Sequence, residues 1–195
     1  MADTYLTRQT LLGRVLKENA EEAWEEFASI YRPFVLILLR RLDIRWEEQE
    51  DIAQEVMVKI LKDIQSYNGK SKFRTWLMTL VRNTAYSHLT KNSRLKTREE
   101  KYATDPTGPI PEQHDFEEMY QKQWEAYICT VAFKRIQPKF TGKAVEVFQM
   151  TMDGQDADKI CHKLKLTKET VYCLRTRVKN ALIDEVARLC QQMEL

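Results

Sequence analysis

The sequence predicts an all-α protein of two small helical domains joined by a flexible linker. Apolar residues recur at three- and four-residue intervals along most of the 195 residues, and no stretch alternates as a half-exposed strand would. Three of the five prolines and one of the five glycines fall within residues 105–111, where a helix cannot continue. We therefore expect an N-terminal domain over 1–98, a linker over 99–115 and a C-terminal domain over 116–195. The spacing predicts helices over roughly 6–18, 20–41, 47–65, 72–90, 116–136, 140–152, 156–164 and 168–191.

Charge is distributed unevenly, although the formal net charge is only +2. Residues 1–98 carry a net charge of +4, residues 99–125 carry −6 and residues 126–195 carry +4, so an acidic connector separates two basic regions. Between Ile64 and Arg98 there is no Asp or Glu, yet there are eight Lys or Arg side chains with aromatic residues among them. Such a run suits single-stranded nucleic acid, because cations neutralise phosphates and rings stack on bases. An ordinary solvated helix face is the alternative.

Cysteines and termini predict a reducing, cytoplasmic location. The four cysteines form no CxxC pair, which favours reduced and mostly buried thiols. The N-terminus does not resemble a signal peptide, and no stretch approaches the roughly 18–20 apolar residues that span a bilayer, so we expect no membrane insertion. The three histidines lack the mutual spacing of a metal site, and no nucleophile–base–acid constellation or phosphate loop is present. We expect no cofactor, no metal and no enzyme activity.

The helix predicted over 47–65 has two different faces. At about 100° per residue, one face gathers apolar side chains: Ile52, Ala53, Val56, Met57 and Ile60. The opposite face carries Asp51, Gln54, Glu55, Val58 and Lys62. This outward patch is a plausible docking surface for a basic partner helix, and a solvated helix face is the alternative.

The helix predicted over 72–90 follows a turn-forming loop. An apolar stripe predicts its core side: Phe73, Trp76, Leu77, Leu80, Val81 and Thr84. The other side presents an exposed set without any acid: Arg74, Thr75, Arg82, Asn83 and Tyr86. The loop upstream, residues 66–70, contains a ring and an amide in Tyr67 and Asn68. A loop of this kind beside a basic helix suits an extruded base, held by stacking and edge hydrogen bonds.

The C-terminal helices have the spacing of a helix-turn-helix. A short amphipathic helix over 156–164 leads through a turn at Lys165 and Leu166 to Thr167, a predicted N-cap. The next helix is predicted to bury Thr170, Val171, Leu174, Val178 and Leu182. It presents Lys168, Glu169, Tyr172, Cys173 and Thr176, flanked by Arg177 and Lys179. In such motifs these positions reach base edges in the major groove while flanking cations contact phosphates, and an ordinary αα-hairpin is the alternative.

Three motifs, in this order and spacing, resemble the extracytoplasmic-function sigma factors, the smallest branch of the sigma factors of bacterial RNA polymerase. They are Glu50-Asp51-Ile52-Ala53-Gln54-Glu55-Val56, then Phe73-Arg74-Thr75-Trp76-Leu77 with Val81-Arg82-Asn83, then Thr167-Lys168-Glu169-Thr170-Val171 with Arg177-Val178-Lys179 and Leu182. The resemblance covers roughly residues 20–94 and 125–190. It implies a subunit that directs core RNA polymerase to specific promoters and assists promoter melting.

The resemblance also implies a role for each matching residue. Asp51, Gln54 and Glu55 would contact the clamp helices of the largest polymerase subunit. A flipped base of the minus-ten element would be captured by Gln65, Ser66, Tyr67 and Asn68. Asn83 would line that pocket, with Arg74, Arg82 and Tyr86 along the single strand. Tyr172, Cys173, Thr176 and Arg177 would read the minus-thirty-five duplex, and an anti-sigma factor is a further partner that the family suggests.

Some residues depart from the family pattern. Lys165 stands where a turn glycine is usual, and a positive φ there would cost roughly 1 kcal/mol. Tyr172 and Cys173 stand where Arg or Ser is common, so the promoter sequence cannot be transferred, and Glu169 suits a cytosine amino group. Because it is predicted to be exposed, Cys173 is also the candidate redox-sensitive thiol. The second hypothesis is a stand-alone helix-turn-helix regulator with 1–98 as a sensing or dimerisation module, which would not require an acid-free run.

Overall fold

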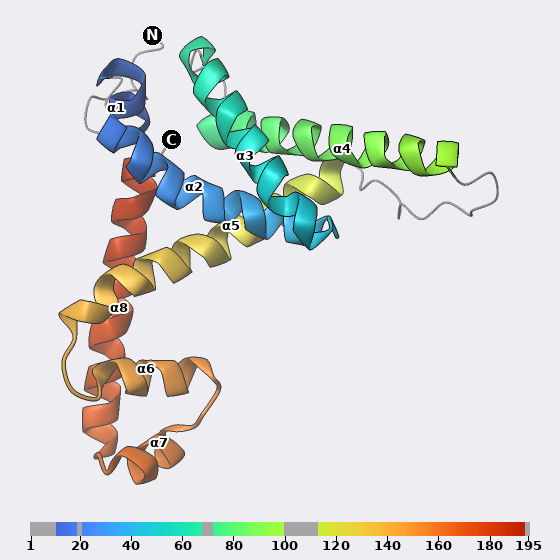
Figure 1. Ribbon diagram of the computed structural model, residues 1–195. Helices are drawn as coiled ribbons and strands as arrows, with labels where there is room; N and C mark the ends of the chain where they lie inside the picture. Colours follow the sequence, from blue (N-terminus) through green and yellow to red (C-terminus); the bar gives the residue numbers. More distant parts are fainter. Residues whose placement is uncertain (1–10, 19–20, 68–71, 100–112, 194–195) are drawn as a thin grey trace. The chain divides into compact units, whose positions relative to one another are not determined.

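The computed structural model describes residues 11–18, 21–67, 72–99 and 113–193, and every regular element in them is helical. The predicted all-α class is confirmed. The α-helices are α1 Leu11–Glu18, α2 Glu21–Arg41, α3 Trp46–Asp63, α4 Phe73–Glu99, α5 Gln113–Ile136, α6 Ala144–Met152, α7 Ala157–Leu164 and α8 Lys168–Met193, with short 3-10 turns η1 Ile64–Ser66 and η2 Gln137–Lys139 (Figure 1). No helix in these ranges is both long and apolar enough to cross a bilayer.

The chain divides into two compact units within α5, between Glu125 and Ala126. The first unit holds α1 to α4, the start of α5 and the last two residues of α8, and the second runs over Ala126–Gln191. The predicted C-terminal domain includes the whole of 116–136, whereas residues 116–125 group with the first unit. The predicted linker over 99–115 lies almost entirely outside the described residues.

The first unit is built around α2, which buries one side of every turn. Its buried residues are Ala23, Phe27, Ile30, Tyr31, Phe34, Val35, Leu38 and Leu39. Helix α1 packs Leu11, Leu12 and Val15 into the same core. Helix α3 buries all five residues that its periodicity predicted, namely Ile52, Ala53, Val56, Met57 and Ile60. Burial of these apolar faces is what holds α1, α2, α3 and α4 together.

The second unit places α6 and α7 beside the first half of α8 (Figure 1). One apolar cluster joins α6, α7 and α8 through Val147, Met150, Ile160, Leu164 and Val171. A second cluster joins the end of α5 to α6 and α8 through Ile136, Ala144, Phe148 and Val178. The predicted burial of Thr170 is wrong, because this residue is exposed and its hydroxyl lies 3.0 Å from that of Thr167.

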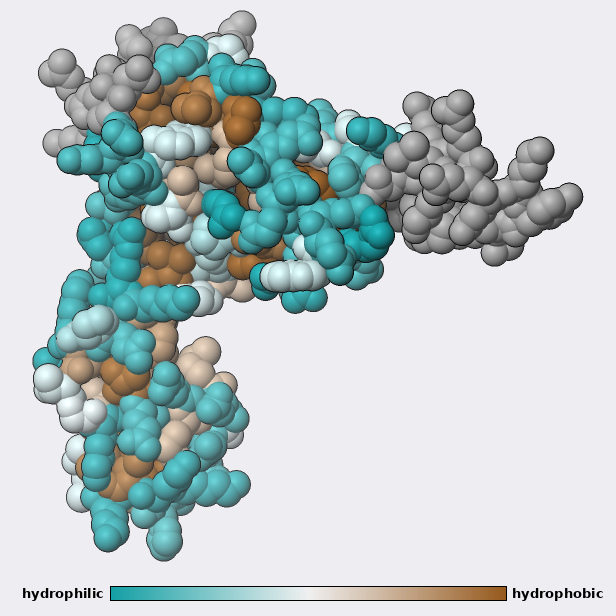
Figure 2. Space-filling model, in the orientation of Figure 1, coloured by the Kyte–Doolittle hydropathy of each residue, from teal (hydrophilic) through white to brown (hydrophobic). Residues whose placement is uncertain are grey.

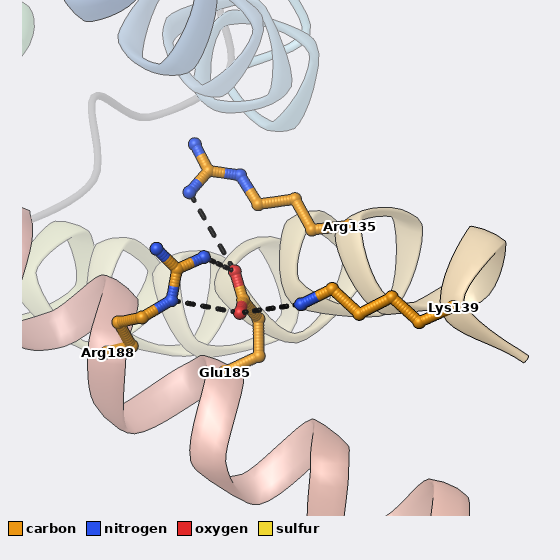
Figure 3. Close-up of polar contacts among 4 residues, drawn as sticks. All are labelled: Arg135, Lys139, Glu185 and Arg188. Atoms are coloured by element: carbon orange, nitrogen blue, oxygen red, sulfur yellow. Dashed lines mark hydrogen bonds and ion pairs between the residues drawn. The ribbon is translucent and has the colours of Figure 1, made fainter.

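A buried carboxylate ties the end of α5 to α8 (Figure 3). Glu185 is only 5% exposed. The Nε–H of Arg188 donates to Oε2 of Glu185 at 3.0 Å, and a second guanidinium N–H of Arg188 donates to Oε1 of Glu185. Arg135 and Lys139 approach the same carboxylate at 3.8 and 3.9 Å. Three cations around one acid therefore fix the η2 turn against the middle of α8.

The cysteines are less buried than predicted. Cys129, Cys173 and Cys190 are exposed, and Cys161 is half-buried against the α6–α7–α8 cluster. The expectation of mostly buried thiols is wrong, because three of the four occupy the solvent side of α5 and α8. The exposure predicted for Cys173 is confirmed.

Candidate nucleic-acid interface

Helix α3 presents the predicted acidic face to solvent. Asp51, Gln54 and Glu55 are all exposed, on the side opposite the buried apolar residues. Val58 and Leu61 extend this face, with 42% and 51% of their surfaces exposed. Acidic and apolar side chains together form a surface suited to a protein partner with basic and apolar side chains.

The loop after α3 is anchored by rings. Gln65 and Ser66 are exposed, and the Ser66 hydroxyl donates to the backbone oxygen of Asp63 at 2.6 Å. Tyr67 is half-buried, with its ring edge-on to Phe73 at 5.6 Å and tilted against Trp76 at 5.9 Å between centroids. Asn68 lies outside the described residues.

An open pocket of about 410 Å³ lies between α3 and α4, beside this loop. Its lining combines an indole face, an aliphatic side chain, hydroxyls, one amide, one ammonium and one carboxylate: Lys59, Asp63, Thr75, Trp76, Thr79, Leu80, Asn83 and Thr84. An aromatic face beside donors and acceptors is what a flat heteroaromatic base needs for stacking and edge hydrogen bonds.

Three of the lining residues change the sequence-based interpretation. Trp76 and Leu80 were predicted to be core residues, but they are half-buried and line the pocket. Their apolar stripe is wider than the surface that α2 and α3 cover, so its edge stays open. Lys59 was not predicted at all, and its Nζ lies 2.7 Å from Glu55 and donates to Thr84 at 3.2 Å. Its position at the boundary between the two faces of α3 is the sequence signal that could have pointed to it.

The five residues predicted on one exposed side of α4 divide between two surfaces. Thr75 and Asn83 are exposed and line the pocket. The Arg74 guanidinium lies 5.2 Å from the Trp124 ring centroid and donates to the Gln121 side-chain oxygen. Arg82 lies 5.2 Å from the Tyr86 ring. Burial raises the pKa of Tyr86, with Arg82 acting in the opposite direction. The expectation of one exposed face is corrected, because α5 covers part of it.

Capping contacts define both ends of α7 and the turn that leads into α8. Asp156 accepts the Lys159 backbone N–H at 2.8 Å, which lowers the pKa of Asp156 and caps α7. At the other end, Lys165, which stands where the family usually has a turn glycine, has φ 51°. The Leu166 backbone N–H donates to the Cys161 carbonyl oxygen at 3.1 Å. The two helices are thus joined by a tight turn at a left-handed residue.

The predicted N-cap of α8 is also confirmed. The Thr170 backbone N–H donates to the Thr167 hydroxyl at 3.3 Å. Lys168 pairs with Asp158 at 2.6 Å, which raises the pKa of Lys168 and links the first turns of α7 and α8. Hydrogen bonds from its own backbone N–H and from the Thr167 hydroxyl lower the pKa of Glu169.

Six of the seven residues predicted to face DNA from α8 are exposed: Lys168, Glu169, Tyr172, Cys173, Arg177 and Lys179. Thr176 is half-buried. Tyr172 is 61% exposed and has the Arg175 guanidinium 5.5 Å from its ring centroid. Arg177 lies 5.5 Å from the Phe140 ring. Figure 2 shows mainly hydrophilic residues over the end of the second unit that carries α7.

The first unit is similar in sequence to known sigma factors. Residues 27–95 match the family model of sigma-70 region 2. Over 100 residues the chain is 35% identical to the ECF RNA polymerase sigma-E factor of Haemophilus influenzae, covering 51% of this chain and 52% of that relative. Over residues 27–95 the chain is therefore similar to region 2 of the sigma-70 family, and its relatives include extracytoplasmic-function sigma factors.

Two further relatives are also sigma factors. The RNA polymerase sigma-H factor of Pseudomonas aeruginosa is 31% identical over 86 residues, 44% of either chain. The ECF RNA polymerase sigma factor SigW of Bacillus subtilis is 29% identical over 76 residues, covering 39% of this chain and 41% of the relative. The chain spans about half the length of the curated relatives that it matches. The region 2 match covers most of α2, all of α3, the pocket and most of α4.

Proposed function

We propose that the protein is a promoter-specificity subunit that directs core RNA polymerase to specific promoters and assists their opening. The observation that carries the proposal is the pocket between α3 and α4, which combines Trp76 and Asn83 beside the Tyr67 ring. The protein would act in the cytoplasm, by binding and without a catalytic step of its own. An anti-sigma factor that occludes these surfaces belongs to the same proposal.

Core polymerase would bind the acidic face of α3. Asp51, Gln54 and Glu55 are exposed, and they would contact the basic clamp helices of the largest subunit. The exposed Val58 and Leu61 add apolar area at the same surface. Mixed acidic and apolar contacts of this kind supply both steering and desolvated area.

The minus-ten strand would be captured at the pocket. Extruding a base costs a few kcal/mol, and stacking on an aromatic side chain returns about 1–3 kcal/mol per base. Tyr67 and Trp76 offer the rings, Asn83 offers an amide, and Lys59 places a positive charge at the wall. Gln65, Ser66 and Asn68 would contribute from the loop. Duplex melting would be favoured because the pocket accepts only an unpaired base.

The minus-thirty-five duplex would be read by the first turns of α8. Lys168, Glu169, Tyr172, Cys173 and Thr176 would meet base edges in the major groove. Arg177 and Lys179 would contact phosphates. The Lys168–Asp158 ion pair and the Thr167 cap support this role, because they link the first turns of α7 and α8 and define where α8 begins.

The test is transcription in vitro with core RNA polymerase and a library of randomised promoters. We expect initiation from a subset of templates, and loss of both initiation and core binding in Asp51→Arg. The control is Asp184→Arg, which reverses an exposed acid on α8 and should leave both unchanged. Circular dichroism of each variant checks that the helices persist. Absence of initiation from every template, without comigration with core, would refute the proposal in favour of a stand-alone DNA-binding regulator.

A further inference from the structure

The first turns of α5 carry large aromatic residues at four-residue intervals. Phe116, Tyr120 and Trp124 are between 0% and 3% exposed. Trp124 stacks on Tyr31 at 5.8 Å and meets the edge of Phe34 at 4.9 Å. This segment of α5 therefore lies on α2 within the first unit, as an amphipathic helix lies in a groove.

The same segment covers the two arginines of α4. Trp124 lies against the Arg74 guanidinium, and the Gln121 oxygen accepts from it. Gln121 in turn donates Nε2 to Glu125 at 2.6 Å. Phe116 meets the edge of the Tyr86 ring at 6.0 Å, and that ring lies against Arg82. Among the described residues, neither arginine forms an ion pair with a carboxylate.

Polar atoms at this contact are buried without partners. Within the described part of the chain, the Nε atoms of Arg74 and Arg82 and the hydroxyl of Tyr120 are the buried side-chain polar atoms that lack a hydrogen bond. A buried donor without an acceptor is unfavourable, so each of these atoms weakens the packing of α5. Phosphate oxygens would satisfy guanidinium donors better than ring faces do.

The covered arginines border the pocket in sequence. Arg74 precedes Thr75 and Arg82 precedes Asn83, and both following residues line the pocket. We expect a single strand with one base in that pocket to run its phosphates along α4. Helix α5 and the strand would therefore compete for the same two guanidinium groups.

We propose that residues 113–125 form an internal latch that masks Arg74 and Arg82 until single-stranded DNA displaces it. The inference rests on the proposed DNA binding at α4. It assigns Gln121 and Trp124 as the residues that hold the latch closed, and it makes the unpaired Tyr120 hydroxyl the feature that keeps the latch weak enough to open.

The test measures binding of a fluorescein-labelled oligothymidylate of 20 nucleotides to the full chain by anisotropy. Gln121→Ala removes the acceptor of Arg74 and should tighten binding roughly threefold to tenfold. Tyr120→Phe removes the unpaired hydroxyl, tightens the latch and should weaken binding by a similar factor. Gln123→Ala changes the same residue type two positions away on α5 and should leave binding within about twofold.

Opening is observed directly by fluorine NMR of protein labelled with 5-fluorotryptophan. The Trp124 resonance, assigned with Trp124→Phe, should move toward the position of an exposed indole on saturation with the oligonucleotide, while that of Trp24 stays. Equal binding by all variants, weaker binding by Gln121→Ala, absence of binding by every variant, or an unmoved Trp124 resonance in the bound state would overturn the latch. Latch behaviour without initiation from any promoter would instead refute the proposed function alone.

Discussion

Replacing Glu185 by Gln should destabilise the second unit and leave the first unchanged. The carboxylate is 5% exposed and is the shared partner of Arg135, Lys139 and Arg188. The amide keeps the shape but removes the charge, so three cations are left close together. At an effective dielectric constant of about 20, a carboxylate and a cation about 4 Å apart attract by about 4 kcal/mol before desolvation.

The net effect is smaller than this Coulomb energy. Breaking a buried ion pair costs about 3–5 kcal/mol when the remaining charge stays buried. Here Arg188 and Lys139 keep 50% and 64% of their side-chain surface exposed, so solvent screens them once the carboxylate is neutral. We therefore expect a loss of about 2 kcal/mol in the free energy of unfolding of the second unit.

The four tryptophans allow the two units to be followed separately. Trp24, Trp46, Trp76 and Trp124 all belong to the first unit, whereas helical circular dichroism reports both units. In urea, Glu185→Gln should lower the midpoint of the dichroism transition of the second unit by about 2 M, for a slope of about 1 kcal/mol per molar. The midpoint seen by tryptophan fluorescence should not move.

The control is Asp184→Asn, which neutralises the neighbouring exposed acid on α8. This change should alter the free energy of unfolding by no more than about 0.5 kcal/mol. If the two variants behave alike, the Glu185 cluster does not stabilise the unit. If tryptophan fluorescence shifts with the dichroism, the assignment of the cluster to the second unit is refuted.

Three further predictions concern the turn, the base pocket and alkaline pH. Lys165→Gly should raise the free energy of unfolding of the second unit by about 1 kcal/mol, because Lys165 has φ 51° and glycine adopts this conformation without strain. An unchanged or lower midpoint in urea would contradict this prediction. Tyr67→Ala should weaken binding to a minus-ten single strand by about 1–3 kcal/mol and leave duplex binding nearly unchanged, and equal losses in gel-shift titrations would exclude the base pocket. Burial raises the pKa of Tyr127 to about 12 and raises those of Tyr86 and Tyr120. Raised tyrosine pKa values favour the folded state fully below pH 10, and this stabilisation is lost as the pH rises toward 12, so dichroism should fall together with the appearance of tyrosinate absorbance at 295 nm.

Local periodicity predicted the elements whose faces depend on one helix alone. The buried and exposed sides of α3 follow from an interval of about 100° per residue, and α3 has a single core to pack against. The turn between α7 and α8 was also predictable from sequence, because the Thr167 cap and the left-handed Lys165 depend only on residues close to them in the chain. Contacts between residues this close in sequence can be predicted from the local sequence alone.

Tertiary structure decided what covers each remaining face. Arg74 and Arg82 look exposed from α4 alone, and only packing of α5, some 40 residues later, places rings against them. Trp76 belongs to an apolar stripe, but its position at the edge of the core makes it a pocket wall. Glu185 is an ordinary helix carboxylate until Arg135 and Lys139 surround it from α5 and η2.

The sequence by itself determined the all-α class, the faces of α3, the helix-turn-helix and the resemblance to the extracytoplasmic-function sigma factors, since all of these depend on spacing within single helices or on short motifs. Tertiary structure alone decided that the chain divides within α5, that a pocket opens between α3 and α4, and that the basic side of α4 is partly covered. The physical reason is that periodicity tells which side of a helix is apolar, whereas only the packed chain determines which distant side chain covers it.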